Sequence, residues 1–277
     1  MLKLALIGCG KMGQAILRGL VASGVVPGKD IVICDVTDGH LKDILAETGS
    51  PFCANPGEAV GMASAVLLAV KPKDMERVLN DIPPGAVRDK LVISIAAGTT
   101  LRMLSSILPP GARIVRAMPN TPALVRMGVT AYTAEHDVRP EDHEFVRALF
   151  GALGSVHHVT EAELEVVTGL SGSGPAYLMT VIEAMADGAV RCGLGRELAL
   201  EMAARTVAGA GELVLRTGQH PAALRDAVAS PGGTTMAGLA ALEARGLRTA
   251  LIEAVTAATL KGREMSAPRR NVDHEEH

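Results

Sequence analysis

The chain has 277 residues, of which 48% are apolar and only 2% are aromatic, and its net charge is −3. This length favours two domains, and the composition predicts a core of Ala, Val, Leu, Ile and Met. The slightly negative charge provides no basic surface for nucleic acid or for an acidic membrane, so it argues against both partners.

Four cysteines, Cys9, Cys34, Cys53 and Cys192, are scattered without a CxxC pair or histidines at metal-ligand spacing. They predict free thiols in a reducing compartment and no metal site. No secretory signal is recognisable, and the longest uncharged stretch, 166–182, is interrupted by glycines and a proline. We therefore expect a cytoplasmic protein without a membrane span.

Short apolar runs alternate with helical patterns in the first half of the chain. The runs are almost continuously hydrophobic, as in strands covered on both faces, and they lie at 3–8, 30–35, 63–70, 90–96, 113–118 and 129–134. Helical patterns separate most of them, at 11–23, 38–48, 73–80 and 99–107. Strands and helices in regular succession predict an α/β fold with a parallel, doubly wound sheet.

A further helix near 141–153 and a short strand at 154–159 complete this first domain, 1–160. From Glu161 onward the sequence shows no strand pattern, and Ala- and Leu-rich helical segments lie at 163–169, 175–192, 196–217, 221–228, 234–245 and 247–265. We predict an all-helical domain over 161–265 that associates with a second copy, because helix 196–217 is apolar on several sides. Residues 266–277 are expected to form a flexible tail.

The first predicted strand ends in GCGKMG, which places Gly8, Gly10 and Gly13 in GxGxxG spacing before a helix. This context is the one that the dinucleotide fingerprint requires. Gly8 permits the tight turn, Gly10 lets a diphosphate approach the backbone, and Gly13 allows close packing of helix on sheet. The backbone from Cys9 through Lys11 and Met12 then offers amides to the diphosphate, so 1–160 is predicted to be a dinucleotide-binding Rossmann domain.

Asp35 ends the second predicted strand, about 20 residues after the glycines, where a carboxylate accepts hydrogen bonds from ribose hydroxyls. The next residue is Val36, and the basic residue nearest in sequence is Lys42. A carboxylate without a neighbouring cation repels a 2′-phosphate, so the sequence favours NADH over NADPH without excluding either. The alternative is that Asp35 is only a turn or N-cap residue.

Ligands of open sheets bind beyond the carboxyl ends of the strands, and four such ends carry candidate residues. They are Asn55, the AVKP segment Ala69, Val70, Lys71 and Pro72, the small residues Ala96 and Ala97, and Asn120 between two prolines. An amide such as Asn120 is suited to bind a nicotinamide carboxamide, and a flat ring can lie against Ala96 and Ala97. Each of these residues alone is more typical of a turn. Together they predict a cofactor site at one edge of the sheet.

Two glycine-rich breaks interrupt the helical half. In TGLSGSGPAYL, Ser173 is expected to cap a helix and Pro175 to begin it. In SPGGTT, Ser230 and Pro231 precede Gly232 and Gly233, and two hydroxyls follow at Thr234 and Thr235. Successive amides at a helix N-terminus bind anions, so this second break is interpreted as a site for a small carboxylate.

Other chemistries receive little support from the sequence. No Ser/His/Asp arrangement has a recognisable context, and no phosphate-binding GxxxxGK[ST] loop is present. The pair His157 and His158 lies on a predicted strand and is interpreted as structural. The mixed-charge segment 135–144 is interpreted as a solvated surface.

Taken in order, GxGxxG, AVKP, ISIAAG, MPNTP, TGLSGSGPAY and RDAVASPGGTTMAGL resemble pyrroline-5-carboxylate reductases from about Leu4 to Glu264. The last motif is specific to that family, whereas the first is shared by many dehydrogenases. The resemblance implies NAD(P)H-dependent reduction of 1-pyrroline-5-carboxylate to L-proline, the last step of proline biosynthesis. It also implies a Rossmann domain, an interlocked homodimer through the helical domain and, in many members, a decamer.

By the same resemblance, SPGGTT holds the substrate carboxylate through Ser230, Gly232, Gly233, Thr234 and Thr235. The Thr235 hydroxyl faces the ring nitrogen, Asn55 and Lys71-Pro72 border the cofactor, and Asn120 lies at its nicotinamide end. Many members carry Arg after the second strand, where this chain has Val36, which puts NADPH preference in doubt.

Two other functions remain open from the residues. A 3-hydroxyacid dehydrogenase usually needs a lysine in its helical domain, and the only lysine after residue 160 is Lys261. A nucleotide sensor without catalysis keeps GCGKMG but has no use for SPGGTT.

Overall fold

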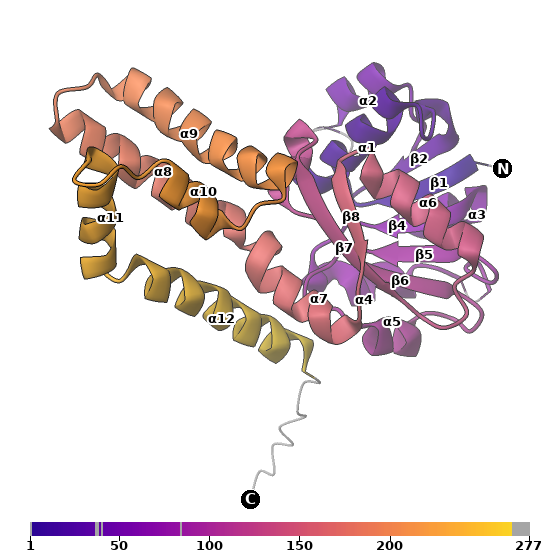
Figure 1. Cartoon of the computed structure of the whole chain (residues 1–277). Coiled ribbons are helices and arrows are strands. Elements are labelled where there is room, and N and C mark those ends of the chain that lie inside the picture. The colour runs from indigo at the N-terminus through magenta and orange to yellow at the C-terminus, as the bar shows by residue number, and fades with distance from the viewer. Residues whose placement is uncertain (1, 37–38, 40, 84, 268–277) are drawn as a thin grey trace, which may run out of the picture. The chain divides into compact units, whose positions relative to one another are not determined.

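The computed structural model describes residues 2–36, 39, 41–83 and 85–267, and its contacts divide the chain into two compact units. The sheet unit comprises Met1–Gly172 together with Ala258–His277, and the helical unit comprises Ser173–Ala257. The two units are shown in Figure 1. Most of the predicted tail lies outside the described residues, as do positions 37, 38 and 40 near the helix expected at 38–48.

Eight strands form one sheet in the order β3-β2-β1-β4-β5-β6-β7-β8. They are β1 (Leu2–Ile7), β2 (Ile31–Cys34), β3 (Phe52–Cys53), β4 (Ala63–Leu68), β5 (Leu91–Ser94), β6 (Arg113–Met118), β7 (Gly128–Ala134) and β8 (Gly154–His158). Every neighbouring pair is parallel except β6 and β7, which are antiparallel. The chain changes its winding direction between β3 and β4, so that β1 lies between β2 and β4.

The expectation of a wholly parallel sheet is therefore wrong for one pair of strands. Residues 119–127 join β6 to β7, and a short 3-10 turn, Thr121–Val125, occupies most of this segment. A parallel crossover requires roughly a dozen residues or more and usually a helix, so this linker can only return the chain antiparallel. The fold class itself, a doubly wound α/β sheet followed by helices, is confirmed.

Helices cover both faces of the sheet, because alternate residues of each central strand point to opposite sides (Figure 1). They are α1 (Lys11–Ser23), α2 (Lys42–Thr48), α3 (Pro56–Met62), α4 (Pro72–Asn80), α5 (Leu101–Ile107), α6 (Pro140–Gly151) and α7 (Glu161–Val167). On β1, Leu4 and Leu6 join a core with α1 and α6, whereas Ala5 and Ile7 join a second core with α3, α4 and α5. The sequence patterns missed only α3 among these helices, although Asn55 and Pro56 are an N-cap followed by proline.

Helix α7 belongs to the sheet unit through a buried arginine. Arg116 on β6 is 2% exposed, and its guanidinium lies 3.1 Å from a Glu161 oxygen and 2.7 Å from a Glu165 oxygen. Glu165 also accepts a hydrogen bond from Ser266, near the end of α12 (Leu247–Ser266). The predicted boundary near residue 160 falls before α7, whereas compactness divides the chain after Gly172.

The segment 135–144 is not uniformly solvated, contrary to its interpretation from charge alone. Asp142, at the start of α6, is 6% exposed and forms a bidentate ion pair with Arg113 on β6. Burial raises the pKa of Asp142, but hydrogen bonds from Arg113 and Arg139 outweigh burial and hold it below its usual value. His143 shares a hydrogen bond of 3.1 Å with the buried Tyr132 hydroxyl, so two of these polar residues face the interior.

The helical unit contains α8 (Gly174–Arg191), α9 (Arg196–Thr217), α10 (Pro221–Ala227), α11 (Thr234–Ala244) and the first part of α12. No strand follows β8 among the described residues, as predicted. Pro175 occupies the first turn of α8 as expected, but the Ser173 side chain makes no cap hydrogen bond because its backbone is already helical. Within the described part of the chain, no helix is long and apolar enough to cross a membrane.

Candidate functional site

The turn after β1 has the geometry that its three glycines predict. Gly8 has φ +90°, and a Cβ at this position would lie 2.8 Å from the Ala69 carbonyl oxygen. A Cβ on Gly13 would lie 2.5 Å from the Gly8 carbonyl oxygen, so α1 can approach the turn only because Gly13 has no side chain. Around Gly10, in contrast, an added Cβ meets nothing within 4 Å. The backbone at Gly10 is therefore open to a ligand.

The N-terminus of α1 follows this open position and lacks a side-chain cap. Gly10 is the N-cap residue, and no acidic residue stands in the first turn. The Gln14 amide is the first to donate to Gly10, so the preceding amides, including those of Lys11 and Met12, have no intrahelical acceptor. These amides and the positive end of the helix dipole suit a diphosphate, so the residues present fit a dinucleotide.

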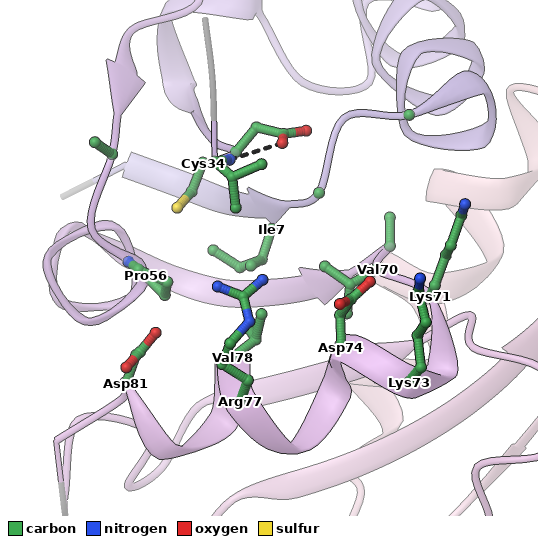
Figure 2. A pocket seen from close by; sticks show the side chains of 16 residues that line it. Ile7, Cys34, Pro56, Val70, Lys71, Lys73, Asp74, Arg77, Val78 and Asp81 are labelled. Carbon is green, nitrogen blue, oxygen red and sulfur yellow. Dashed lines mark hydrogen bonds between the residues drawn. The ribbon is translucent and has the colours of Figure 1, made fainter.

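Two adjacent hollows lie along the carboxyl ends of the strands. The first, of about 390 Å³, extends from the glycine turn past the end of β2 to α4 (Figure 2). The second, of about 340 Å³, lies beside the ends of β4, β5 and β6. Among the predicted cofactor residues, the structure places the following at these hollows: Gly8, Gly10, Lys11, Met12, Asp35, Ala69, Val70, Lys71, Pro72, Ala96 and Ala97.

Asp35 ties the end of β2 to the glycine turn. One of its carboxylate oxygens accepts the Cys9 amide at 2.7 Å, and the other accepts the Val36 amide, also at 2.7 Å. Asp35 lines the first hollow, where Val36 is 73% exposed. The side chain of Cys9 is fully buried, and burial, followed by the Asp35 charge, raises its pKa to about 12. Cys9 therefore contributes backbone to the turn and remains a neutral thiol.

Two cationic side chains at the first hollow were not identified from the sequence. Lys73 and Arg77 line it from α4, whereas Lys42, the basic residue nearest to Asp35 in sequence, lines neither of the two hollows. The spacing of Lys73 and Arg77 by four residues places them on one face of the helix that follows AVKP. That helical spacing, combined with the position of AVKP at a strand end, is the signal that identifies them.

Asn55 and Asn120 hold loops in place. Asn55 caps α3, because its side-chain oxygen accepts the Glu58 amide at 3.0 Å. Asn120 is 7% exposed; its side-chain oxygen accepts the Val129 amide at 2.8 Å, and its amide donates to the Ser171 carbonyl at 3.0 Å. Both neighbours of Asn55, Ala54 and Pro56, line the first hollow. A direct contact of either asparagine with a cofactor stays a prediction.

The second glycine-rich break lies in the helical unit and forms the start of α11. Gly232 has φ +69°, and the Gly233 amide donates to the Ser230 carbonyl at 3.0 Å. A Cβ on Gly233 would lie 2.3 Å from the Ser230 hydroxyl, so glycine is required for this hydroxyl to fold against the turn. Gly233 is also the N-cap residue, without a side-chain cap and without an acidic residue in the first turn.

The amides that follow Gly233 are consequently available to an anion. Ala237 is the first residue of α11 whose amide donates to the Gly233 carbonyl. The amides of Thr234, Thr235 and Met236 therefore have no intrahelical acceptor. Thr234 is exposed and Thr235 half-buried, so their hydroxyls lie near the same helix end. Uncharged donors at a positive helix end can hold a carboxylate without a side-chain cation.

Comparisons with known proteins agree with both halves of this description. Residues 3–98 match the family model of NADP oxidoreductases, coenzyme F420-dependent, and residues 161–265 match the pyrroline-5-carboxylate reductase dimerisation model. The dimerisation model covers the region that was predicted to associate with a second copy. The resemblance drawn from short motifs is thus confirmed by matches over whole segments.

Full-length relatives and solved structures extend the agreement. Pyrroline-5-carboxylate reductase of Escherichia coli is 43% identical over 95% of this chain and 98% of its own, and that of Methanosarcina acetivorans is 41% identical over 95% and 97%. The solved reductase of Coxiella burnetii has a TM-score of 0.88 at 36% identity, covering 96% of this chain and 99% of its own. The Plasmodium falciparum pyrroline carboxylate reductase, solved with NADP bound, has a TM-score of 0.87 at 30% identity, covering 96% and 98%. This chain belongs to the pyrroline-5-carboxylate reductase family.

Proposed function

We propose that this chain reduces 1-pyrroline-5-carboxylate to L-proline with NADH or NADPH, the last step of proline biosynthesis. The observation that carries the proposal is the uncapped N-terminus of α11 behind Ser230–Gly233, in a chain that also has an open glycine turn for a dinucleotide. Neither feature alone specifies the substrate. Together they supply a place for a small carboxylate and a place for a nicotinamide cofactor.

The sheet unit binds the cofactor. Amides at the start of α1 hold the diphosphate, and Lys71 lines both hollows and faces the same anion. Ala96 and Ala97 present small side chains at the second hollow, where a flat nicotinamide ring can lie close to the backbone. The cofactor supplies hydride chemistry once it is bound, and the task of the protein is to orient and shield it.

The helical unit binds the substrate carboxylate. Amides of Thr234 and Thr235 and the Ser230 hydroxyl donate to it, with Gly232 and Gly233 shaping the turn. The Gly233 amide itself is engaged with the Ser230 carbonyl, so its role is to form the turn and not to contact the ligand directly. Thr235, half-buried in the first turn of α11, is the residue that we assign to the ring nitrogen.

Uncharged donors suit this reaction. A protonated cyclic imine already accepts hydride readily, so the site needs no strong general acid, and a nearby cation would disfavour the iminium. Holding the ring in one orientation supplies the main acceleration, because orientation of two reactants is worth about 7–11 kcal/mol. The site thus relies on placement and on neutral dipoles.

Association through the helical unit belongs to the same proposal. The match of 161–265 to a dimerisation model supports oligomerisation, and we propose a homodimer as the basic assembly, with a decamer as the higher one. We also propose a cytoplasmic location. Its support is the scattered placement of the four cysteines, which the structure leaves unpaired and of which Cys9 and Cys34 are buried.

The function is tested by following the oxidation of NADH and of NADPH by absorbance in the presence of 1-pyrroline-5-carboxylate. Thr235→Ala is expected to lower kcat/KM for the imine about 10- to 100-fold, as expected for a lost hydrogen bond to a charged group. NADH affinity, measured by fluorescence, should not change. Thr206→Ala, an exposed threonine on α9, is the control and should leave both quantities unchanged. If Thr235→Ala retains full activity, Thr235 does not contact the ring nitrogen of the substrate as we propose.

A further inference from the structure

Arg77 is a cation in the first hollow that the proposed mechanism does not use. It lies on α4, is exposed, and rises toward the side of the hollow formed by Ile7 and Cys34 (Figure 2). Asp74 and Asp81 stand one helical turn before and after it. The guanidinium nevertheless forms no ion pair or side-chain hydrogen bond with any residue that the structure describes. A long cationic side chain without a partner at the wall of a hollow is available to a ligand.

The position of Arg77 along the hollow identifies the part of the ligand that it meets. The glycine turn marks the diphosphate, and the residue that ends β2 marks the ribose next to adenine. Arg77 lines the hollow together with Cys34, Val36 and Pro56, which stand at or just after the ends of β2 and β3. This end of the hollow therefore takes the adenine ring of the cofactor.

The chemistry of this end favours a flat neutral ring over a second phosphate. Its lining is largely apolar, with Ile7, Cys34, Ala54, Pro56 and Val78 around the cavity. The hollow as a whole is lined by three cationic side chains, Lys71, Lys73 and Arg77, and by three carboxylates, Asp35, Asp74 and Asp81. A dianionic 2′-phosphate on the ribose beside Asp35 would be repelled by that carboxylate. A neutral adenine ring is not repelled by the carboxylates, and the planar cation of Arg77 attracts an aromatic face.

We propose that Arg77 forms one wall of the adenine site and stacks its guanidinium on the adenine ring of NADH and NADPH alike. Val36 carries no charge and is largely exposed, so stacking from α4 takes the place of a cation after β2. The inference rests on the proposed cofactor site. The inference adds that a residue of α4 contributes to the affinity of the protein for the adenine part of the cofactor. This contribution does not depend on whether the cofactor carries a 2′-phosphate.

Binding measurements test the proposal without requiring turnover. Arg77→Ala should lower the affinities for NADH and for NADPH by the same factor, about 3- to 30-fold, as expected for the loss of a cation on an aromatic face. The affinity for AMP, measured by titrating AMP as a competitor of NADH, should fall by that factor too. Reduced nicotinamide mononucleotide, which lacks adenine, should bind with unchanged affinity. Arg77→Lys should recover only part of the loss, because an ammonium group is not planar.

Each alternative result has a distinct meaning. Loss of NADPH affinity alone would overturn the proposal in favour of a 2′-phosphate contact, and unchanged affinity for all four ligands would also overturn it. Arg102→Ala, an exposed arginine on α5 outside both hollows, is the matched control and should change nothing. Gly10→Val separates this inference from the proposed site. If Gly10→Val leaves the affinity for NADH intact, the proposed cofactor site itself is wrong. If Gly10→Val lowers the affinity for NADH and Arg77→Ala does not, only the stacking by Arg77 is wrong.

Discussion

The sheet unit and the helical unit bury their apolar side chains to very different extents. In the sheet unit, two cores of Leu, Ile and Val cover both faces of the strands, and most of these side chains are inaccessible to solvent. In the helical unit, the one cluster of buried hydrophobic residues consists of Ala186, Ala199 and Ala203. Large apolar side chains on α8 and α9, such as Met179 and Met202, are more than half exposed.

The difference shows which unit can supply its own stability. A domain whose cores are closed on both faces gains most of its burial within one chain. A group of helices whose buried residues are alanines gains little, because each alanine removes only a small apolar area from water. The helical unit therefore leaves large apolar side chains available for association, in agreement with its match to a dimerisation family.

The largest effect is expected inside the sheet unit, at its buried ion pair. Asp142→Ala leaves Arg113 buried without its carboxylate and should lower the free energy of unfolding by about 3–5 kcal/mol, measured in urea. The exposed pair Arg216 and Glu212 on α9 is the control from the helical unit. Glu212→Ala should change stability by less than about 1 kcal/mol. Equal losses in the two variants would mean that the Arg113 pair is solvated in solution.

The next effect concerns the surface of the helical unit. Met202 is 54% exposed on α9 in the single chain. If a second copy covers it, Met202→Glu buries a charge in the interface, and the dissociation constant of the dimer should rise at least about 30-fold, as at an interface hot spot. Sedimentation velocity over a dilution series measures the change. Glu201→Gln, at the neighbouring charged residue, is the control and should leave the dissociation constant unchanged. If Met202→Glu also leaves the dissociation constant unchanged, the interface lies elsewhere.

The sequence predicted well those features that depend on neighbouring residues. The roles of Gly8, Gly10 and Gly13 follow from a strand and a helix directly beside them, and the observed turn confirms the tight turn, the open position and the close packing. The helices of the second half were found for the same reason. Their limits are set by local glycines and prolines, as at Gly195 before α9 and Pro221 in α10.

Features that join distant residues were missed. Charge pattern alone placed Asp142 in solvent, because its partner Arg113 lies on another element of the sheet. Lys42 was considered as the cation nearest to Asp35 along the chain, whereas Arg77 reaches the same hollow through the fold. The direction of β7 depends on the short linker before it, which a hydrophobic pattern cannot reveal. In each case the tertiary arrangement decides the outcome.

A smaller effect should separate the anion site from the stability of α11. Gly233→Ala introduces a Cβ that would lie 2.3 Å from the Ser230 hydroxyl, which must then move away from the turn. Displacement of the Ser230 hydroxyl weakens one of several hydrogen bonds to the substrate carboxylate. If this weakening costs about 1 kcal/mol, KM for the imine should rise about fivefold with little change in the unfolding midpoint. Gly238→Ala, inside α11 with open space around its Cβ, is the control. It should leave KM unchanged and stabilise the helix by up to about 1 kcal/mol.

The smallest effect is a pH dependence that belongs to the sheet unit alone. Burial, then repulsion by His158 and Arg147, lowers the pKa of His143 despite the attraction of Asp142. Its ring lies 5.0 Å from that of His158, which stacks on Tyr132 at 4.8 Å. Because the folded state binds the proton less readily than the unfolded chain, the stabilising contribution is complete above about pH 6.5 and declines as the pH falls below it.

Unfolding in urea between pH 7.5 and 5.5 measures this decline. His143→Gln should reduce the slope of stability against pH, because a glutamine does not titrate and can still accept a hydrogen bond from the Tyr132 hydroxyl. His157→Gln removes an exposed histidine of β8 and should leave the slope as it is. If both variants retain the slope, the acid sensitivity comes from other groups, and the ring cluster is rigid packing without a role in the pH response of the sheet unit.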